Sequence, residues 1–526
     1  MSKRTIGFIM LLLGLFAAIG EIRGIDFPTA RWFFSASRDV PLLKWKTEYG
    51  AFLWFGWISS AILVFGGISL CMKSFSGGPP NPVALRRVKR FREIKRGYYS
   101  LVILLGLAGF ASLDQVVVGK QALAVQYGGK WFFPAFKPKP FKGSDFGIAG
   151  ELAEAPVNYR KLKKDFGKDD SAGKVIMPLI PFGSTDDTLK PRSKSLTERL
   201  GVFNESGGRD PYFGLAAKYY DVEEGSFHLR FTLRNGKFNG PVDGWNAEGE
   251  RVYTAEYRKG EKLKEKFSGA GSVEDFLAIE SGELRALKYH PSPPIWEEGN
   301  LLGTTSQGYD VLAYLYGGLQ VNFKAALIFL PIVYAVGITI GMLMGYLGGW
   351  FDLVMDRAIE IFSNMPFLFV VIILSSMVPE QFKGLPIILT ILMLFGWMGI
   401  ASLMRTAAYR DKERDYIAAA RVLGAGTPRI IFSHLLPNTV AIIVTLVPFT
   451  MSSLISSLTA LDYLGFGLPP EYATWGRLLN DGLSNLSAPW LVSATFFVLV
   501  GLLVLITFIG EAVREAYDPK KFSYYR

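Results

Sequence analysis

The feature that most constrains the fold of this chain is a series of apolar segments, each close to the length that crosses a lipid bilayer. A membrane-spanning helix needs about 20 mainly apolar residues because the hydrocarbon core is about 30 Å thick. Backbone polar groups in lipid must be bonded within the segment, so each segment is expected to be helical. The sequence therefore predicts an all-α polytopic membrane protein with about eight transmembrane helices, at residues 5–22, 50–72, 98–117, 322–347, 352–377, 384–407, 438–463 and 489–512.

The first of these segments has an alternative interpretation. Residues 5–22 follow Lys3 and Arg4, as the apolar part of a cleaved signal peptide would. Its small-x-small string, Ala18-Ile19-Gly20, is a poor cleavage site. We therefore expect a retained span.

Composition adds an aqueous part to the membrane part. Half of the 526 residues are hydrophobic and the mean hydropathy is +0.25, yet 20% of the residues are charged. Such a chain needs a sizeable domain in water beside its spans. A net charge of +11 in a membrane protein indicates basic cytoplasmic loops rather than nucleic-acid binding. The single cysteine, Cys71, excludes an internal disulfide, and three histidines far apart in sequence predict no metal site.

Basic residues orient the predicted spans. Residues 73–97 hold a Gly/Pro linker and the run LRRVKRFREIKR. This basic run is expected to face the cytoplasm and, in addition, to bind anionic lipid. Residues 118–320 then lie outside, and the alternation of sides places residues 348–351, 408–437 and both termini in the cytoplasm. The inside loop carries the expected basic residues, Arg405, Arg410, Lys412, Arg414, Arg421 and Arg429.

The outer region is predicted to be mainly β in an insertion at about residues 190–288. Within it, residues 227–263 alternate in polarity, and Arg234-Asn235-Gly236 and Glu248-Gly249 are turn signals between strands. Over barely two units this stretch resembles MORN-type hairpin repeats, and an unrelated β-meander explains it equally well.

We call residues 409–437 the elbow. The sequence there predicts two short helices joined at a glycine turn. The first runs from Asp411 to Leu423 and is stopped by Gly424 and Gly426, since glycine readily adopts the left-handed conformation of a helix end. Thr427 is expected to cap the second helix, with Pro428 at its first position. That helix is expected to end at His434–Pro437.

The spacing of the elbow resembles the cytoplasmic coupling loop of ABC-importer permeases. In that family the loop seats in a groove of the ATPase subunit, and the form His-x-Leu-Pro is typical of peptide importers. The resemblance implies an ATPase-coupling set of Ala418, Ala419, Ala420, Arg421, Gly424, His434, Leu436 and Pro437. The family usually has Glu at the position of Ala418, so that charged contact is missing here. An ordinary amphipathic loop between two spans is the alternative.

Two further stretches resemble peptide-importer permeases. Residues 302–311 match a Leu-Gly-Thr motif that precedes the second core helix, with Thr305 and Tyr309 departing from it. Residues 460–482 match a glycine and tryptophan loop expected beside the docking surface of a binding protein, with its proline pair one residue early. The external-loop residues implied are Gly303, Thr304, Asp310, Pro469, Pro470 and Trp475.

Polar residues inside the fifth predicted span mark a candidate pathway. Asp356, Glu360 and Asn364 share one helix face, and Arg357 neighbours them. They either line a translocation cavity or hold the helices in register, and a purely structural role near the cytoplasmic interface is the alternative. The series Gly337, Gly341 and Gly345 predicts close helix packing rather than gating. Three prolines are candidate kinks, namely Pro331, Pro366 and Pro448.

The domain plan follows from these features. It comprises an N-terminal hairpin (1–75), a basic linker (76–97), the first core helix (98–117), an extracytoplasmic domain (118–320), a permease core (321–513) containing the elbow, and a cytoplasmic tail (514–526).

Residues of about 86–190 and 290–526 together resemble peptide-importer permeases of the dipeptide/oligopeptide class, most closely the Yej-type oligopeptide and microcin C importers. The resemblance implies a type I ABC-importer core that forms half of a peptide pathway in the inner membrane. It also implies a second permease, two ATPase subunits or a fused one, and an extracytoplasmic peptide-binding protein as partners, with lipid around them.

The chain is not expected to be an enzyme. It has no phosphate-binding loop, so ATP and Mg would be bound by the partner ATPase and no cofactor or metal by this chain. Two other functions stay open: a transport-inactive permease-like scaffold, suggested by Ala418 and the large insertion, and an envelope sensor that uses the outer domain.

Overall fold

The computed structural model describes most of the chain from residue 82 to residue 517. The described ranges are 7–15, 64–66, 68–69, 82–113, 116–136, 140–148, 150, 153–167, 173–185, 187–189, 192–199, 201–205, 211–221, 226–246, 248–269, 272–278, 284–296, 299–379 and 382–517. Apart from short helical stretches, the predicted spans 5–22 and 50–72 lie outside these residues, as does the end of the predicted tail.

The described residues form four helices long and apolar enough to cross a membrane, or up to six if each of two bent helix pairs is one span. The four are α10 (Val311–Leu347), α13 with α14 (Leu385–Gly396 and Met398–Lys412), α16 through α17 (Thr427–Tyr463), and α19 (Pro489–Tyr517). The bent pairs are α6 (Pro82–Glu93) with α7 (Lys95–Ser112), and α11 (Gly349–Ser363) with α12 (Phe367–Met377). Four of the six segments predicted from residue 98 onward thus hold a long apolar helix, and the other two lie in the bent pairs.

One predicted span is not continuous. Residues 352–377 divide into α11 and α12, whose axes differ by 84°. The break falls at Asn364–Pro366, where Pro366 lacks an N–H group and disfavours helical conformation in the preceding residue. Pro331 and Pro448, in contrast, lie inside α10 and α17, which continue through them.

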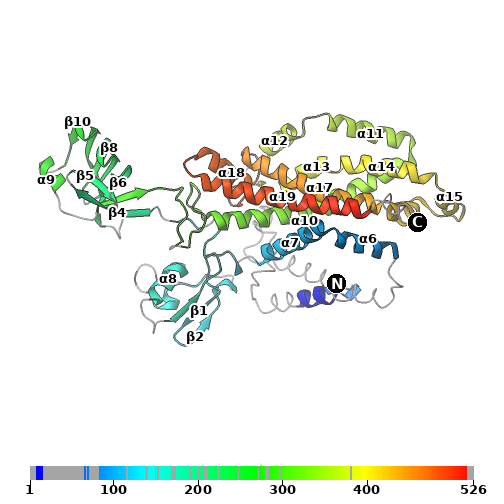
Figure 1. Ribbon diagram of the computed structural model, residues 1–526, viewed down its shortest axis with the longest axis horizontal. Helices are drawn as coiled ribbons and strands as arrows, with labels where there is room; N and C mark the ends of the chain where they lie inside the picture. Colours follow the sequence, from blue (N-terminus) through cyan, green and yellow to red (C-terminus); the bar gives the residue numbers. More distant parts are fainter. Residues whose placement is uncertain are drawn as a thin grey trace. The chain divides into compact units, whose positions relative to one another are not determined.

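In the helix bundle of Figure 1, the C-terminal half of α10 packs closely against α14. A Cβ atom added at Gly341 would lie 2.2 Å from the Ala401 carbonyl oxygen, and one at Gly345 would lie 2.4 Å from that of Arg405. Gly337 is similarly tight against Ile400. The predicted packing role of the three glycines is therefore confirmed.

The helix bundle has two ends. We call the end that carries residues 409–437 the elbow end, and there Gly97 of α7 packs against Ala512 of α19. At the opposite end, the Tyr316 hydroxyl and the Gln320 amide donate hydrogen bonds to the carbonyl oxygens of Phe110 (2.8 Å) and Ala111 (2.9 Å). Helix α18 (Trp475–Ser484) follows α17 at this opposite end.

Residues 117–187 add a small sheet to the same compact unit. Its strands β1 (Ala124–Tyr127), β2 (Lys130–Phe132) and β3 (Gly173–Ile176) are antiparallel in the order β2-β1-β3. Helix α8 (Tyr159–Phe166) contributes Tyr159, Leu162 and Phe166 to an aromatic-rich core beneath the sheet.

A second compact unit comprises Thr188–Ile295 and Gly303–Gly308. It contains an eight-stranded antiparallel sheet in the order β10-β9-β8-β7-β6-β11-β4-β5, and helix α9 (Val273–Ala278). The strands are β4 (Arg192–Arg199), β5 (Val202–Glu205), β6 (Gly214–Asp221), β7 (Ser226–Arg234), β8 (Lys237–Trp245), β9 (Arg251–Arg258), β10 (Glu261–Phe267) and β11 (Leu284–Lys288).

The predicted hairpin turns in this unit are present. Asn235 and Gly236 have φ of +50° and +69° between β7 and β8, and Gly249 has φ of +84° between β8 and β9. The sheet is nevertheless no simple meander, because β11 lies between β6 and β4.

Candidate functional site

The first arm of the elbow is shorter than predicted. Helix α14 continues to Lys412, and α15 begins only at Asp415 and ends at Val422. The buried carboxylate of Asp411 makes ion pairs with Arg410 (3.0 Å) and Arg414 (3.1 Å), and its carbonyl oxygen accepts a hydrogen bond from the Arg414 N–H. These contacts fix the turn between α14 and α15, so the predicted start at Asp411 was wrong.

The glycine turn closes α15 as a Schellman motif. Gly424 has φ of +79°, and the Ala425 N–H donates to the Ala420 carbonyl oxygen (3.0 Å) while the Gly424 N–H donates to that of Arg421 (2.9 Å). The predicted left-handed role is confirmed for Gly424.

The capping prediction was wrong by one residue. Gly426 has φ of −71° and is itself the N-cap of α16 (Thr427–Arg429), so it is not a left-handed stop and Thr427 is the first helical residue rather than the cap. Proline fits the first turn of a helix because the N–H groups there have no intrahelical acceptor, so Pro428 alone could not fix the register.

The second arm does not end at His434–Pro437. It passes through a π-helical segment, η7 (Ile430–Leu435), directly into α17 (Leu436–Tyr463). Pro437 has no N–H group and its ring crowds the preceding turn, and the wider π turn accommodates it without stopping the helix. The elbow is therefore continuous with a predicted span.

The elbow has one face buried and one apolar tip exposed. Ile417, Ile430 and Leu435 are buried in the largest apolar cluster of the bundle, together with residues of α10 and α13. At the tip, the side chains of Val422 and Leu423 are 88% and 86% exposed. Exposed large apolar residues beside a rigid turn indicate a surface that a partner covers.

The predicted coupling residues are divided between these two faces. Ala420 is buried, and His434 and Leu436 are half-buried. The exposed members are Ala418, Ala419, Arg421, Gly424 and Pro437. The Arg421 guanidinium lies over the Tyr346 ring of α10 (5.1 Å to the centroid), and its Nε donates to the Tyr346 hydroxyl (3.3 Å). The sequence analysis missed Val422 and Leu423, although two apolar residues before a glycine in a basic loop were a visible signal.

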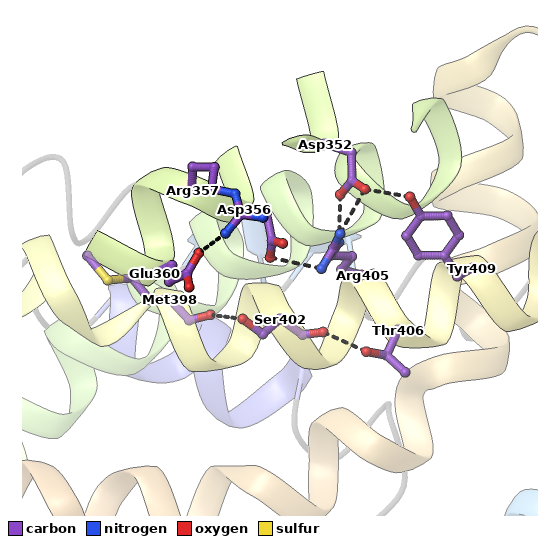
Figure 2. A network of polar contacts seen from close by, with 9 residues as sticks. All are labelled: Asp352, Asp356, Arg357, Glu360, Met398, Ser402, Arg405, Thr406 and Tyr409. Carbon is purple, nitrogen blue, oxygen red and sulfur yellow. Dashed lines mark hydrogen bonds and ion pairs between the residues drawn. The ribbon is translucent and has the colours of Figure 1, made fainter. Parts of the chain in front are cut away.

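A charged network ties α11 to α14, the helix that leads into the elbow (Figure 2). The guanidinium of Arg405 donates two hydrogen bonds to the Asp352 carboxylate (2.6 and 2.8 Å) and one to Asp356 (2.8 Å). The Tyr409 hydroxyl donates to the same Asp352 carboxylate (2.5 Å). The Asp352 side chain is only 8% exposed, so its charge depends on these partners.

The structure separates the predicted pathway residues. Asp356 is engaged by Arg405, whereas Arg357 makes an ion pair with Glu360 on its own helix, with side chains 63% and 54% exposed. Asn364 is the C-cap of α11. Sequence reasoning missed Asp352, Arg405 and Tyr409, although the spacing of Asp352 and Asp356 places both on one helix face.

The loop at the opposite end of the bundle is internally braced. Trp475 is buried and its indole N–H donates to the Leu315 carbonyl oxygen of α10 (2.9 Å). Arg477 donates to the carbonyl oxygens of Pro469 (3.3 Å) and Tyr472 (3.0 Å). Pro470 is exposed.

The other predicted external-loop residues have structural contacts. In the β unit, Gly303 has φ of +79°, and the buried Thr304 hydroxyl lies 2.7 Å from both His290 Nδ1 and the Ser292 backbone N. Asp310 is the N-cap of α10 and accepts a hydrogen bond from the Ala313 N–H (2.8 Å).

A pH-dependent stability is expected from Asp310. Burial raises the pKa of its carboxyl group from 3.8 to about 6, although backbone N–H groups of Ala313 and Leu312 favour the charged form. Between these values the native state binds the proton more tightly than the unfolded chain, so stability falls by about 3 kcal/mol as pH rises through the window. We expect Asp310→Asn to remove this dependence while keeping the cap, and Asp310→Ala to lose about 1 kcal/mol of capping as well.

The measurement is the thermal midpoint of the purified protein from pH 4 to 7, for the parent and both variants. If the thermal midpoint of Asp310→Asn depended on pH as that of the parent does, the Asp310 carboxyl group would not be the source of the pH dependence.

The described residues contain no group of three or more His, Cys, Asp or Glu side chains that could hold a metal ion. His228 is buried in the β unit, where its Nε2 lies 3.0 Å from the Phe276 carbonyl oxygen.

Long apolar helices and an exposed apolar turn continuous with one of them are typical of a membrane protein whose turn a partner covers. Residues 337–523 match the family model "Binding-protein-dependent transport system inner membrane component". That range includes the elbow and the charged network.

Curated relatives extend this match over most of the chain. The inner membrane ABC transporter permease protein YejE of Escherichia coli K12 is 33% identical over 441 residues, 84% of this chain and 98% of that protein. The peptidoglycan transport system permease protein YejE of Agrobacterium fabrum is 41% identical over 222 residues, 42% of this chain and 58% of that protein. The dipeptide transport system permease protein DppC of Bacillus subtilis is 32% identical over 248 residues, 47% of this chain and 76% of that protein.

The chain therefore belongs to the family of binding-protein-dependent transport permeases. It is a multi-pass inner-membrane permease subunit of an ABC transporter and is not itself catalytic. ATP is handled by ATPase partners, and an extracytoplasmic binding protein is the other partner that the family implies.

Proposed function

We propose that this permease forms half of the pathway of an importer for peptides or peptide-like compounds. The names of its relatives include dipeptide, oligopeptide and peptidoglycan transport. The substrates in those names all contain peptide bonds. The other half of the pathway would be a second permease, with two ATPase subunits or a fused one on the cytoplasmic side.

The observation that carries the coupling role is the exposed tip of the elbow. Val422 and Leu423 project beside Gly424, while Ile417, Ile430 and Leu435 anchor the elbow in the bundle. An apolar tip of this kind fits a groove on the ATPase subunit. The exposed Ala418 and Ala419 lie on the same short helix and would extend the contact.

Motion of the elbow would reach the pathway through two rigid connections. Helix α17 continues from the elbow without a break, and α14 is joined to α10 by close packing and to α11 by Arg405. Closure of the ATPase subunits would move α14, α17 and the helices packed on them as one rigid body. Alternating access follows if the outward-open and inward-open states of the permease pair make different contacts with the ATPase.

The elbow end of the bundle is assigned to the cytoplasm. The basic residues of α6 and of residues 405–429 gather at this end, together with the C-terminal part of α19. Both termini would then be cytoplasmic, and the β unit would lie outside.

The exposed pair Arg357–Glu360 is the best candidate for contact with substrate. Ile359, between them, lies in one apolar cluster with Met398 and Ala401, and Met398 is half-way along the span Leu385–Lys412. A charged side chain at mid-depth costs about 3 kcal/mol or more in contact with lipid. The pair therefore faces water or protein in the assembled transporter, and it offers opposite charges to the two termini of a peptide. The break at Asn364–Pro366 lies beside it, as in transporters that bind substrate at interrupted helices.

Replacing the pair by neutral amides, Arg357→Gln with Glu360→Gln, should reduce peptide uptake by about tenfold or more, because a hydrogen bond to a charged group contributes about 1.5–3 kcal/mol. Uptake by cells and the amount of assembled transporter are measured together. The matched control is Lys262→Gln with Glu265→Gln, which removes an i,i+3 ion pair of β10 in the β unit. Equal uptake by both double variants would exclude Arg357 and Glu360 from the pathway.

Reconstitution tests the proposed function as a whole. We expect ATP hydrolysis by the complete transporter in lipid vesicles to rise when the binding protein and a peptide are added together. Absence of stimulation would instead support the transport-inactive scaffold, which the missing Glu at Ala418 favours, or a sensor that uses the outer domain.

A further inference from the structure

Helix α6 is not part of a straight span. Its axis makes an angle of 95° with that of α7, the apolar helix that follows after Ile94. If α7 crosses the bilayer, α6 runs nearly parallel to the membrane surface.

The junction between the two helices is held by the C-terminal part of α19. The Arg96 guanidinium makes ion pairs with Glu511 (3.6 Å) and Glu515 (3.8 Å). The Arg87 guanidinium lies 4.7 Å from the centre of the Tyr517 ring. Gly97 approaches Ala512 so closely that an added Cβ would lie 2.0 Å from the Ala512 Cβ. The position of α6 at the elbow end is therefore fixed by contacts within the bundle.

The side of α6 that faces away from α19 is amphipathic. Leu85 and Val88 are 54% and 53% exposed and lie one turn apart on the helix. The exposed basic side chains around them are Arg86, Lys89 and Arg92. Apolar residues bordered by basic ones on a helix of 12 residues are typical of helices that lie in a membrane interface.

We propose that α6 lies in the head-group region of the inner leaflet, with Leu85 and Val88 inserted among acyl chains and the basic side chains bound to anionic phospholipid. The chemistry favours lipid over a protein groove for two reasons. The helix is attached to a span, so it is held at the depth where head groups begin. Long basic side chains extend to phosphate while their stems stay on the apolar side. Lipid bound to α6 would also lie beside the C-terminal part of α19, which contacts α6 and α7.

The test uses the complete transporter in lipid nanodiscs. In a Cys71→Ser background, a nitroxide label is attached to Val88→Cys, and in a matched control to Arg86→Cys on the polar side. The nanodiscs contain phosphatidylcholine with or without phosphatidylglycerol. Accessibility to oxygen, which concentrates in lipid, is compared with accessibility to a water-soluble nickel chelate.

We expect the Val88 label to favour oxygen and the Arg86 label to favour the nickel chelate. A Val88 label as accessible to nickel as the Arg86 label would overturn the proposal. Protection of the Val88 label from both reagents would show that a protein surface, such as the ATPase, covers α6 instead, and would also overturn it.

Retention of labelled phosphatidylglycerol through purification tests the charge requirement. Each basic residue near an anionic surface contributes about 1 kcal/mol, or about fivefold in affinity. The triple variant Arg86→Gln, Lys89→Gln and Arg92→Gln should therefore retain at least about tenfold less of the lipid, and retention equal to that of the parent would contradict the proposal.

Discussion

Arg405→Ala is expected to destabilise the permease by about 3–5 kcal/mol, because it leaves the buried Asp352 carboxylate without its main partner. Arg405 is itself 27% exposed, so partial access of water places the effect toward the lower end of this range. The variant should assemble poorly with its partners and lose most uptake. The thermal midpoint of the purified transporter measures the effect.

Two further variants separate this charge effect from a general loss of side-chain packing. Asp352→Asn combined with Arg405→Gln removes both charges and should recover part of the lost stability, since no unpaired charge is left buried. Lys142→Ala removes a solvent-exposed partner of Glu154 and serves as the control for loss of a surface ion pair. Arg405→Ala with the thermal midpoint of Lys142→Ala would show that the network does not hold α11 to α14.

Gly424→Asp is expected to reduce peptide uptake by at least about tenfold while ATP hydrolysis by the ATPase subunits continues. A Cβ at Gly424 meets no atom within 4 Å, and Asp tolerates the left-handed conformation, so the elbow should keep its fold. The new carboxylate would instead lie at the apolar tip of the elbow. Docking of the ATPase subunit would bury this unpaired charge, which is unfavourable. Each 1.4 kcal/mol of binding free energy lost lowers the affinity for the ATPase about tenfold. Uptake and ATP hydrolysis are measured on the same preparation.

Gly249→Asp is the matched control for this variant. Gly249 has φ of +84°, and its added Cβ also meets no atom within 4 Å, but it lies in a hairpin of the β unit. It carries the same backbone strain and the same new charge. Normal uptake by Gly424→Asp would refute the elbow assignment, whatever the control shows.

Local signals in the sequence predicted a large part of the fold. Segment length and hydropathy located the four long apolar helices and the two bent helix pairs, and Gly424 and Asn235-Gly236 predicted the conformations found there. Each of these features depends on a few neighbouring residues. The same reasoning stopped the elbow at Pro437, because proline usually ends a helix, and could not foresee the π turn that lets α17 begin there.

Features that depend on packing between distant segments were not predicted. Asp352 and Arg405 are 53 residues apart, and their pairing depends on the register of α11 against α14, which no local pattern fixes. The place of β11 between β6 and β4 is likewise decided by the core of the sheet. Within the candidate site, the family motif indicated the alanines and the glycine, whereas the degree of exposure of Val422 and Leu423 is set by the folded turn.

The most direct test of the coupling role is photo-crosslinking from position 423 in the assembled transporter. A photoreactive amino acid in place of Leu423 is irradiated in membranes, and its adducts are identified by mass. The proposed role predicts an adduct with the ATPase subunit, lost when the ATPase is absent. An adduct with the extracytoplasmic binding protein, or none with the ATPase in an active transporter, would contradict it.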